Sequence, residues 1–365
     1  MMSENRWMAT GNYFTTYRQE QRIFATHSDR LIFALFLVVL FSWPYFIELS
    51  TKYMLVIDNI LIAVIAVYGL NLVTGFAGQI SVGHATFMGV GAYTVASVAG
   101  VIGDQHVLIT HAWPLMIFLS GLMGAAMGLV VGLPALRLRH LYLLMATLSF
   151  QLIFQWVIGS MEFFNQGQFI YVGRVHWFSG EVGRSQHYMF WYYALLVTVI
   201  VCGFGFRNIL RTRYGRSLVA VRDNDRAADA MGMHPGFTKV FAFGLAGFFA
   251  GIAGALQAYL NRGAGFETFT LHESIQYLAM TIVGGLGQLT GCIFGPAAIR
   301  LLDLQVESLA QWAGEILPSS LDLATGLRPL SFGLVIVLFL IFEPRGIANW
   351  WRIMRAYVKL WPFRY

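Results

Sequence analysis

One glycine-rich segment constrains the fold of this chain more than any other, and it reads Asn71-Leu-Val-Thr-Gly-Phe-Ala-Gly-Gln-Ile-Ser-Val-Gly-His-Ala-Thr-Phe-Met-Gly-Val-Gly-Ala-Tyr93. Glycines interrupt its apolar residues, and Gln79, Ser81 and His84 lie in its middle. Backbone that leaves a regular helix at membrane depth must be buried in protein or line a water-filled cavity. Gln, Ser and His side chains can offer hydrogen bonds to a solute that has left its water. We therefore expect this segment to line a path through a membrane.

The composition is that of a membrane protein. Of the 365 residues, 57% are hydrophobic and 12% are charged, and the mean hydropathy is +0.63. Soluble domains carry about a quarter charged residues. At about twenty apolar residues per span, the chain has room for roughly ten crossings. We expect an all-α, polytopic bundle of about ten transmembrane helices, some of them broken or re-entrant.

The charges and cysteines exclude several other classes of protein. The net charge of +6 comes mainly from arginines at helix ends and in loops, which is typical of membrane topology signals rather than of nucleic-acid binding. Cys202 and Cys292 both fall within apolar runs, where a buried, inert thiol is the usual case. We expect no disulfide framework, no metal, no cofactor and no nucleic-acid partner.

Apolar runs place the expected crossings along the chain. The segments are residues 31–49, 53–73, 80–102, 113–133, 141–160, 188–206, 240–260, 272–285, 290–304 and 329–342, with a kink expected at Pro44. The segments 272–285 and 290–304 are short, so they fit either two spans or a pair of half-spans.

The distribution of lysine and arginine predicts the orientation. Basic residues gather in residues 1–30, around Arg137, in the loop 207–239 and in residues 344–365. An even number of expected crossings separates each of these segments from the next, so all four can face the cytoplasm together. We expect residues 1–30 to be a cytoplasmic tail without a secretory signal, residues 31–343 to be the transmembrane domain, the loop 161–187 to lie outside, and residues 344–365 to be a basic cytoplasmic tail.

Small residues recur at the four-residue spacing that lets membrane helices approach closely. This spacing indicates tight packing within one subunit, with a subunit interface as the alternative. The positions are Gly124, Gly128 and Gly132; Ala92, Ala96 and Gly100; Gly247 and Gly251; and Gly287, Gly291 and Gly295.

The first motif has an internal echo. The sequences Gly75-Phe-Ala-Gly-Gln-Ile-Ser81 and Gly284-Gly-Leu-Gly-Gln-Leu-Thr290 share the pattern G-x-x-G-Q, an aliphatic residue and a hydroxyl. Coincidence in a glycine-rich chain is one explanation. The other is a pair of matching helix breaks that flank one pathway, as in transporters built from repeats.

A second motif lies in the basic loop and reads Arg213-Tyr-Gly-Arg-Ser-Leu-Val-Ala-Val-Arg-Asp-Asn-Asp-Arg-Ala-Ala-Asp-Ala-Met-Gly232. Asn224 or Asp225 can cap a helix that starts at Arg226, and Gly232 fits its C-terminal end. The result is a short helix with a small alanine face that can dock into a groove of a partner protein. A basic loop that only sets topology would explain the arginines but not the capped helix.

These two motifs resemble the signature of the permeases of branched-chain amino acid ABC importers, and the resemblance extends from about Ile60 to Gly346, leaving out the loop after Ser160. It implies a permease in the bacterial inner membrane that works with a second permease subunit, two ATPase subunits and a periplasmic substrate-binding protein. The loop around Phe163 departs from the family pattern, so branched-chain amino acids are the default solute and related amino acids stay open. In this family a cytoplasmic helix couples the permease to its ATPase. The residues that would carry this coupling are Asp223, Asn224, Ala227, Ala228, Met231 and Gly232.

The chain itself has no nucleotide-binding loop. No G-x-x-x-x-G-K-[ST] sequence is present, and none of the three lysines, Lys52, Lys239 and Lys359, follows a glycine. If transport is driven by ATP, separate partner subunits bind the nucleotide.

Polar residues within the apolar segments are the candidates for solute contact, because such residues in membranes are usually functional. The substrate-pathway candidates are Gln79, Ser81, His84, Thr147, Gln151 and Gln276. Each has a structural alternative: His84 can be a satisfied packing residue, and Thr147 and Gln151 can bond across helices. Asp58 and Asp303 are expected to pair with a neighbouring helix or with Arg300.

Two other classes of function stay open at this point. An ion-gradient-driven secondary transporter would use Asp58 or Glu273 as its proton site. A membrane enzyme or a non-transporting assembly factor is the second rival, although no nucleophile–base pair stands out in the sequence. We expect a transporter subunit rather than an enzyme.

Overall fold

The computed structural model describes residues 27–46, 51–102, 107–138, 141–177, 180–181, 187–316, 323–343 and 345–360. The chain divides into a large unit, Met54–Ala348, and a small unit made of residues 1–53 and 349–365. Most of the expected tail 1–30 lies outside the described residues, and its last four residues already belong to a helix.

The described part of the large unit is predominantly helical, as the sequence predicts. Its elements are α3 (Thr51–Asn71), η1 (Leu72–Phe76), α4 (His84–Ile102), α5 (Val107–Thr110), α6 (Trp113–Gly132), η2 (Leu133–Leu136), α7 (Leu141–Ser160), η3 (Glu162–Gly167), α8 (His187–Arg211), α9 (Arg213–Asp223), α10 (Asp225–Ala230), α11 (Pro235–Leu260), η4 (Phe266–Phe269), α12 (Leu271–Gly284), α13 (Gly291–Ile316) and α14 (Leu323–Phe342). The helices α2 (His27–Phe46) and most of α15 (Ile347–Leu360) belong to the small unit.

Five helices in the described residues are long and apolar enough to cross a membrane. They are Thr51–Phe76, Trp113–Leu136, Leu141–Ser160, His187–Arg211 and Pro235–Leu260. Each coincides with an expected crossing. The chain is therefore a multi-pass membrane protein, and α2, α4, α12, α13 and α14 would supply the remaining crossings of the expected ten.

Some boundaries differ from the sequence prediction. The segment expected as residues 290–304 is a helix of 26 residues, α13, so it is not a half-span. Charged residues beyond Leu304 hid its second half from a search for apolar runs. The described loops also contain four strands of two residues each, which the expected all-α fold did not include. They are β1 (Ile170–Tyr171), β2 (His176–Trp177), β3 (Gly180–Glu181) and β4 (Gly263–Ala264).

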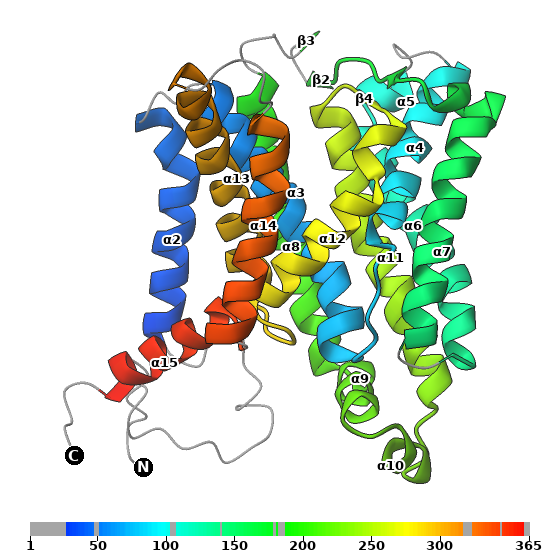
Figure 1. Cartoon of the computed structure of the whole chain (residues 1–365), viewed down its shortest axis with the longest axis vertical. Helices are drawn as coiled ribbons and strands as arrows, with labels where there is room; N and C mark the ends of the chain where they lie inside the picture. Colours follow the sequence, from blue (N-terminus) through cyan, green and yellow to red (C-terminus); the bar gives the residue numbers. More distant parts are fainter. Residues whose placement is uncertain are drawn as a thin grey trace. The chain divides into compact units, whose positions relative to one another are not determined.

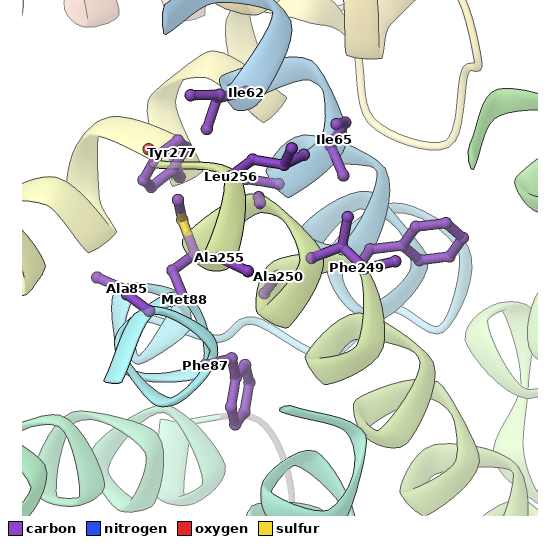
Figure 2. Close-up of a cluster of buried hydrophobic side chains, with 14 of the residues drawn as sticks. Ile62, Ile65, Ala85, Phe87, Met88, Phe249, Ala250, Ala255, Leu256 and Tyr277 are labelled. Carbon is purple, nitrogen blue, oxygen red and sulfur yellow. The ribbon is translucent and has the colours of Figure 1, made fainter. Parts of the chain in front are cut away.

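The core of the large unit forms around α11, which is buried along most of its length. Side chains from α3, α4 and α12 meet α11 in one apolar cluster (Figure 2). The cluster includes Ile62, Ile65, Ala85, Phe87, Met88, Phe249, Ala250, Ala255, Leu256 and Tyr277. By contrast, α7 and α8 leave about two thirds of their most apolar windows outside this core, as expected of helices that face lipid.

Glycines bring the helices into backbone contact. A Cβ atom on Gly124 would meet the carbonyl oxygen of Gly247, which joins α6 to α11, and one on Gly91 would meet the carbonyl oxygen of Gly251, which joins α4 to α11. Gly284 and Gly291 join α12 to α13 in the same way. The expected tight packing within one subunit is confirmed at Gly124, Gly247, Gly251 and Gly291. At Gly100 it is not, because the nearest atom to an added Cβ is 3.8 Å away.

The functional loops gather at opposite ends of the large unit. Helices α9 and α10 lie at the lower end in Figure 1, and the short strands lie at the upper end. There, β1 pairs antiparallel with β4, so the loop after α7 is tied to the loop after α11. Within the large unit, α9 and α10 are thus separated from the short strands by the length of the helices.

Candidate functional site

The helical backbone ends at Phe76 and resumes only at His84, within the glycine-rich first motif. The last turn of α3 widens into the π-helical turn η1, in which the Ala77 amide donates to the carbonyl of Leu72 at 2.9 Å, and the Gln79 amide then donates to Val73 at 2.8 Å. Gly78 follows with φ +67°, a conformation that glycine adopts without steric cost. Residues 77–83 form no helix before α4 begins at His84. Such π turns within helices are frequent at functional sites.

Side chains from two other helices satisfy the backbone at this break. The Oε1 atom of Gln151, on α7, accepts from the Thr86 amide at 3.0 Å and from the Thr86 hydroxyl at 2.7 Å. Its Nε2 atom donates to the carbonyl of Phe269 at 2.8 Å. Ser274, on α12, donates to the same Oε1 atom at 3.1 Å and accepts from the Ala85 amide at 2.9 Å. The first turn of α4 is therefore capped by other helices rather than by its own residues.

Thr147 completes this arrangement one turn from Gln151. Its hydroxyl accepts from the Val82 amide at 3.3 Å and donates to Leu144 on its own helix at 2.9 Å. A Cβ on Gly83 would meet the Thr147 carbonyl at 2.5 Å, so the broken segment lies directly against α7. Thr147 and Gln151 thus form hydrogen bonds between helices, which is the structural role that the sequence analysis gave as the alternative to solute contact. Each buried donor left without an acceptor costs about 1–3 kcal/mol.

His84 bridges the helices on either side of the break. Its Nε2 atom lies 2.9 Å from the carbonyl oxygen of Ala66 on α3, so Nε2 carries the proton and Nδ1 is left as an acceptor. Its ring lies edge-on to Tyr277, with ring centroids 6.3 Å apart. Within the described residues, His84 Nδ1 and the Ser81 hydroxyl are buried without a hydrogen-bond partner. These two groups are free to accept a bond from another molecule.

The other two pathway candidates do not join this cluster. Gln79 is half-buried, and its Nε2 atom donates to Ala77 in its own loop at 3.2 Å. Gln276 faces α13, where its Oε1 atom accepts from Arg300 at 3.4 Å. Its Nε2 atom lies 3.1 Å from His272 Nε2, one turn earlier on its own helix α12.

Arg300 organises a second polar cluster between α12 and α13. Its guanidinium lies 3.5 Å from a carboxylate oxygen of Glu273 and 3.7 Å from one of Asp303. The expected pairing of Asp303 with Arg300 is confirmed. The pairing expected for Asp58 is wrong for the described part of the chain, because both carboxylate oxygens are buried there without a partner.

The second motif forms the short helix that its caps predict. The Asn224 side chain accepts from the Arg226 and Ala227 amides at 3.0 and 3.1 Å, α10 runs from Asp225 to Ala230, and Gly232 follows with φ +81°. Met231 is 82% exposed, and Ala227 and Gly232 are exposed as well. Asp223 is exposed beside Arg222. The alanine face is smaller than expected, however, because Ala228 is only 4% exposed.

Three residues of this region were not predicted from the sequence. Ser274 caps α4. Asn71 accepts from the Gly287 amide at 2.9 Å and donates to Gln288 at 3.1 Å. Arg222 donates to the carbonyl of Gly75 at 2.9 Å. Asn71 opens the first quoted motif as a lone amide in an apolar run, and that position was the available signal.

The break presents hydrogen-bonding groups rather than a cluster of metal ligands. Within the described ranges, no three His, Cys, Asp or Glu side chains gather closely enough to hold a metal ion. What the break does offer is a buried hydroxyl and a buried imidazole acceptor at a place where the helix is open.

Comparison with known proteins gives one family. Residues 54–342 match the family described as "Branched-chain amino acid transport system / permease component". The high-affinity branched-chain amino acid transport system permease protein LivM of Escherichia coli is 29% identical over 304 residues, which cover 76% of this chain and 68% of LivM. LivM of Salmonella typhimurium is 28% identical over 289 residues, covering 72% and 65%. The chain thus spans about two thirds of the length of these relatives.

A third relative is covered almost completely. The inner membrane ABC transporter permease protein YjfF of Escherichia coli is 24% identical over 327 residues, which cover 87% of this chain and 90% of YjfF. No solved structure matches the chain.

Proposed function

This chain belongs to the family of permease components of branched-chain amino acid transport systems, and from that premise we propose that it is the membrane-spanning subunit of an ATP-driven importer for branched-chain or related amino acids. It is a transporter permease and not an enzyme. The proposal concerns which solute the chain carries, which subunits it assembles with and which of its residues contact them.

The break between η1 and α4 is the observation that carries it. A segment of seven residues without helix, 77–83, lies between two helices of a membrane protein and is held by α7 and α12. Backbone of this kind is tolerated at membrane depth where it is buried in protein or lines a cavity, and transporters place such breaks at their solute sites. Ser81 and His84 would offer acceptors to the solute's ammonium group, while Gln79 is the half-buried residue at the cytoplasmic side of the break.

Thr147, Gln151 and Gln276 have a different role in this proposal. Thr147 and Gln151 would set the position of α4 and so the width of the path. Gln276 would act through the Arg300 cluster. Solute selection would take place largely in a separate periplasmic binding protein.

The exposed helix α10 supports ATP-driven coupling. Asp223, Asn224, Ala227, Met231 and Gly232 are exposed, whereas Ala228 would support the helix from below. A helix of this size can seat in a groove of an ATPase subunit. The complete importer would contain a second permease subunit and two ATPase subunits in the inner membrane. The loops 207–239 and 344–365 would face the cytoplasm, and the loop 161–187 would face the binding protein.

Co-purification tests this function. The tagged chain, expressed with its neighbouring subunits, is expected to recover two ATPase subunits and a second permease. The Ala227→Glu variant is expected to lose the ATPases but keep the second permease. Recovery of the chain alone, together with uptake that follows a proton gradient, would refute the proposal.

An ion-gradient-driven transporter is the second candidate, and Asp58 is the observation that favours it. Its carboxylate is fully buried, and neither oxygen has a partner within the described residues. A buried carboxylate of this kind is a typical proton site. Under this alternative Asp58→Asn would abolish proton-coupled uptake, whereas under the importer proposal ATP-dependent uptake would persist.

A further inference from the structure

The two motifs that share the G-x-x-G-Q pattern, Gly75–Ser81 and Gly284–Thr290, are in contact in the structure. Gly75 of the first and Gly287 of the second are in backbone contact, because a Cβ on Gly75 would meet the Gly287 amide nitrogen. Gly78 and Gly287 hold the same fourth position in the two motifs, and their φ angles are +67° and +72°. We call Gly75, Gly78 and Gly287 the glycine junction. The shared backbone conformation makes coincidence a poor explanation of the echo.

Asn71 fastens the two sides of the junction to each other. Its Oδ1 atom accepts from the Gly287 amide at 2.9 Å, and its Nδ2 atom lies 3.1 Å from the Gln288 carbonyl and 3.0 Å from the Cys292 sulfur. Asn71 is fully buried. One side-chain amide therefore joins the π turn before α4 to the turn before α13.

Arg222 reaches this junction from the loop that carries α10. Its Nη1 atom donates to the Gly75 carbonyl at 2.9 Å. A Cβ added to Gly78 would lie 2.7 Å from the Arg222 Cγ atom. A Cβ added to Gly287 would lie 3.0 Å from the Arg222 Nη1 atom. One side chain thus contacts all three glycines. A larger residue at Gly78 or Gly287 would displace it.

The connection from Arg222 to α10 is short and stiff. At the end of α9 the Asn224 backbone amide donates a hydrogen bond to the Ala220 carbonyl at 3.0 Å, and the Asn224 side chain caps α10. Asp225, the first residue of α10, pairs with Lys239 of α11. Only Asp223 and Asn224 separate Arg222 from α10, so a displacement of α10 moves the base of the Arg222 side chain.

We propose that Arg222 is the positioning residue through which movement of α10 reaches the π turn at the end of α3 and the turn before α13. The inference rests on the function proposed above. When α10 is displaced, the Arg222 guanidinium shifts the Gly75 carbonyl to which it donates. Asn71 then transmits this shift to Gly287, whose amide it accepts from. The path would then open or close on both sides of the junction at once.

The test compares ATP hydrolysis with uptake in the complete importer. The complex of this chain with its partner subunits is reconstituted in proteoliposomes with its binding protein, and radiolabelled leucine, isoleucine and valine are the probes. Arg222→Gln removes the charged donor, and Arg222→Met keeps the stem against Gly78 without the donor. Both are expected to lower uptake per ATP hydrolysed about tenfold while hydrolysis continues, the loss that corresponds to one charge-assisted hydrogen bond.

Two further variants separate coupling from general damage. Arg222→Lys, which can still donate to Gly75, is expected to restore most of the ratio. Arg216→Gln is the matched control, because Arg216 lies on the same helix, is exposed and donates only to Arg211 in its own loop among the bonds described. It is expected to behave as the wild type.

Each outcome decides the matter. Wild-type uptake per ATP in both Arg222→Gln and Arg222→Met overturns the inference alone. Failure of both variants to assemble also overturns it, because Arg222 would then hold the fold rather than transmit movement. If the wild-type complex shows no ATP-dependent uptake of these three or of related amino acids, the proposed function fails, and this inference fails with it.

Discussion

At the scale of single residues, Gln151 carries more of the structure than any other polar side chain of the candidate pathway. Its amide group joins α4, α12 and the turn before α12 through four hydrogen bonds. Replacing it by Leu would leave several buried donors and one carbonyl unpaired at about 1–3 kcal/mol each, with part of the loss recovered by relaxation. We expect Gln151→Leu to lower the free energy of unfolding by about 2–4 kcal/mol. Thermal unfolding in detergent, followed by loss of monodisperse protein, measures the shift.

Gln155 provides the matched control for this prediction. It lies one turn further along α7 and is only partly buried, so Gln155→Leu is expected to leave the unfolding temperature nearly unchanged. Equal effects of the two substitutions would mean that the loss of any glutamine from α7 matters, and would contradict the capping role of Gln151.

The sequence predicted which residues of the site are polar and buried, but not what they do. Gln79, Ser81 and His84 were identified because polar residues are rare in apolar runs. Gln151 was found in the same way, yet its partners Thr86 and Ser274 are distant in sequence. Ser and Thr are common in membrane helices, so neither gave a signal. The role of Arg222 was hidden because arginine in a cytoplasmic loop already has a sufficient explanation in topology.

At the scale of helices, the glycine contacts of α11 are expected to limit substitution. A Cβ on Gly91 of α4 would collide with the Gly251 carbonyl of α11, and neither backbone can move without displacing a buried helix. We expect Gly91→Ala to lower the free energy of unfolding by about 1–3 kcal/mol, as overpacking usually does. Chemical denaturation or a thermal-shift assay on the purified protein would measure it.

Gly100, on the same helix, is the comparison. The nearest atom to an added Cβ is the Ile170 Cγ2 atom at 3.8 Å, which is ordinary contact. Gly100→Ala is expected to be neutral or to stabilise the protein by up to about 1 kcal/mol through helix propensity. A destabilised Gly100→Ala variant would show that α4 is sensitive along its whole length rather than at its contact with α11.

Helix boundaries were predictable where apolar runs end abruptly and not where they fade. Residues 141–160 were placed correctly, because Leu141 and Ser160 border a clean run. The second half of α13 was missed because Glu307 and Glu315 interrupt its apolar pattern. Helix α15 was missed because its arginines suggested only a basic tail. Its apolar residues in fact recur at helical spacing.

The α15 helix leads to a prediction about the membrane surface. Trp350, Ile353, Met354 and Tyr357 are all more than half exposed, and Arg352 lies on the opposite side of the helix by its spacing from Met354. Helices with one aromatic and apolar face and one cationic face lie in the membrane interface. We expect a nitroxide label at Met354→Cys to be reached by oxygen and one at Arg352→Cys to be reached by an aqueous nickel chelate.

That measurement needs the full chain in a bilayer. The native cysteines Cys202 and Cys292 are both buried, so the introduced cysteine is expected to take most of the label. Equal access of the nickel chelate to both positions would place α15 in water and contradict an interfacial helix.

At the scale of the whole molecule, the helical bundle around α11 is distinct from the α9–α10 loop. That loop lies at one end of the large unit (Figure 1). Composition and motif spacing were sufficient to predict this division, because hydropathy identifies membrane spans and capping residues identify a short exposed helix. Neither identifies the contact between the two glycine turns, which are more than two hundred residues apart.

Sidedness is the prediction that belongs to this scale. Met231, beside α10, is 82% exposed, and Tyr171, on β1 at the other end of the large unit, is 71% exposed. If the basic loops face the cytoplasm, a membrane-impermeant maleimide should label Met231→Cys in inside-out vesicles but not in intact spheroplasts. Tyr171→Cys should show the reverse pattern. Labelling of both positions from one side would contradict the even spacing of crossings on which the orientation depends.

The same reagent can distinguish an α10 helix that is bound to an ATPase from one that is free. Because an ATPase seated on α10 would cover Met231, Met231→Cys in inside-out vesicles should be labelled several-fold more slowly when the partner subunits are co-expressed. Arg213→Cys, exposed at the start of α9, serves as the cytoplasmic control and should keep its rate if docking is confined to α10. Equal slowing at both positions would indicate that the partner covers the entire loop, and no slowing at either would leave α10 without a docking role.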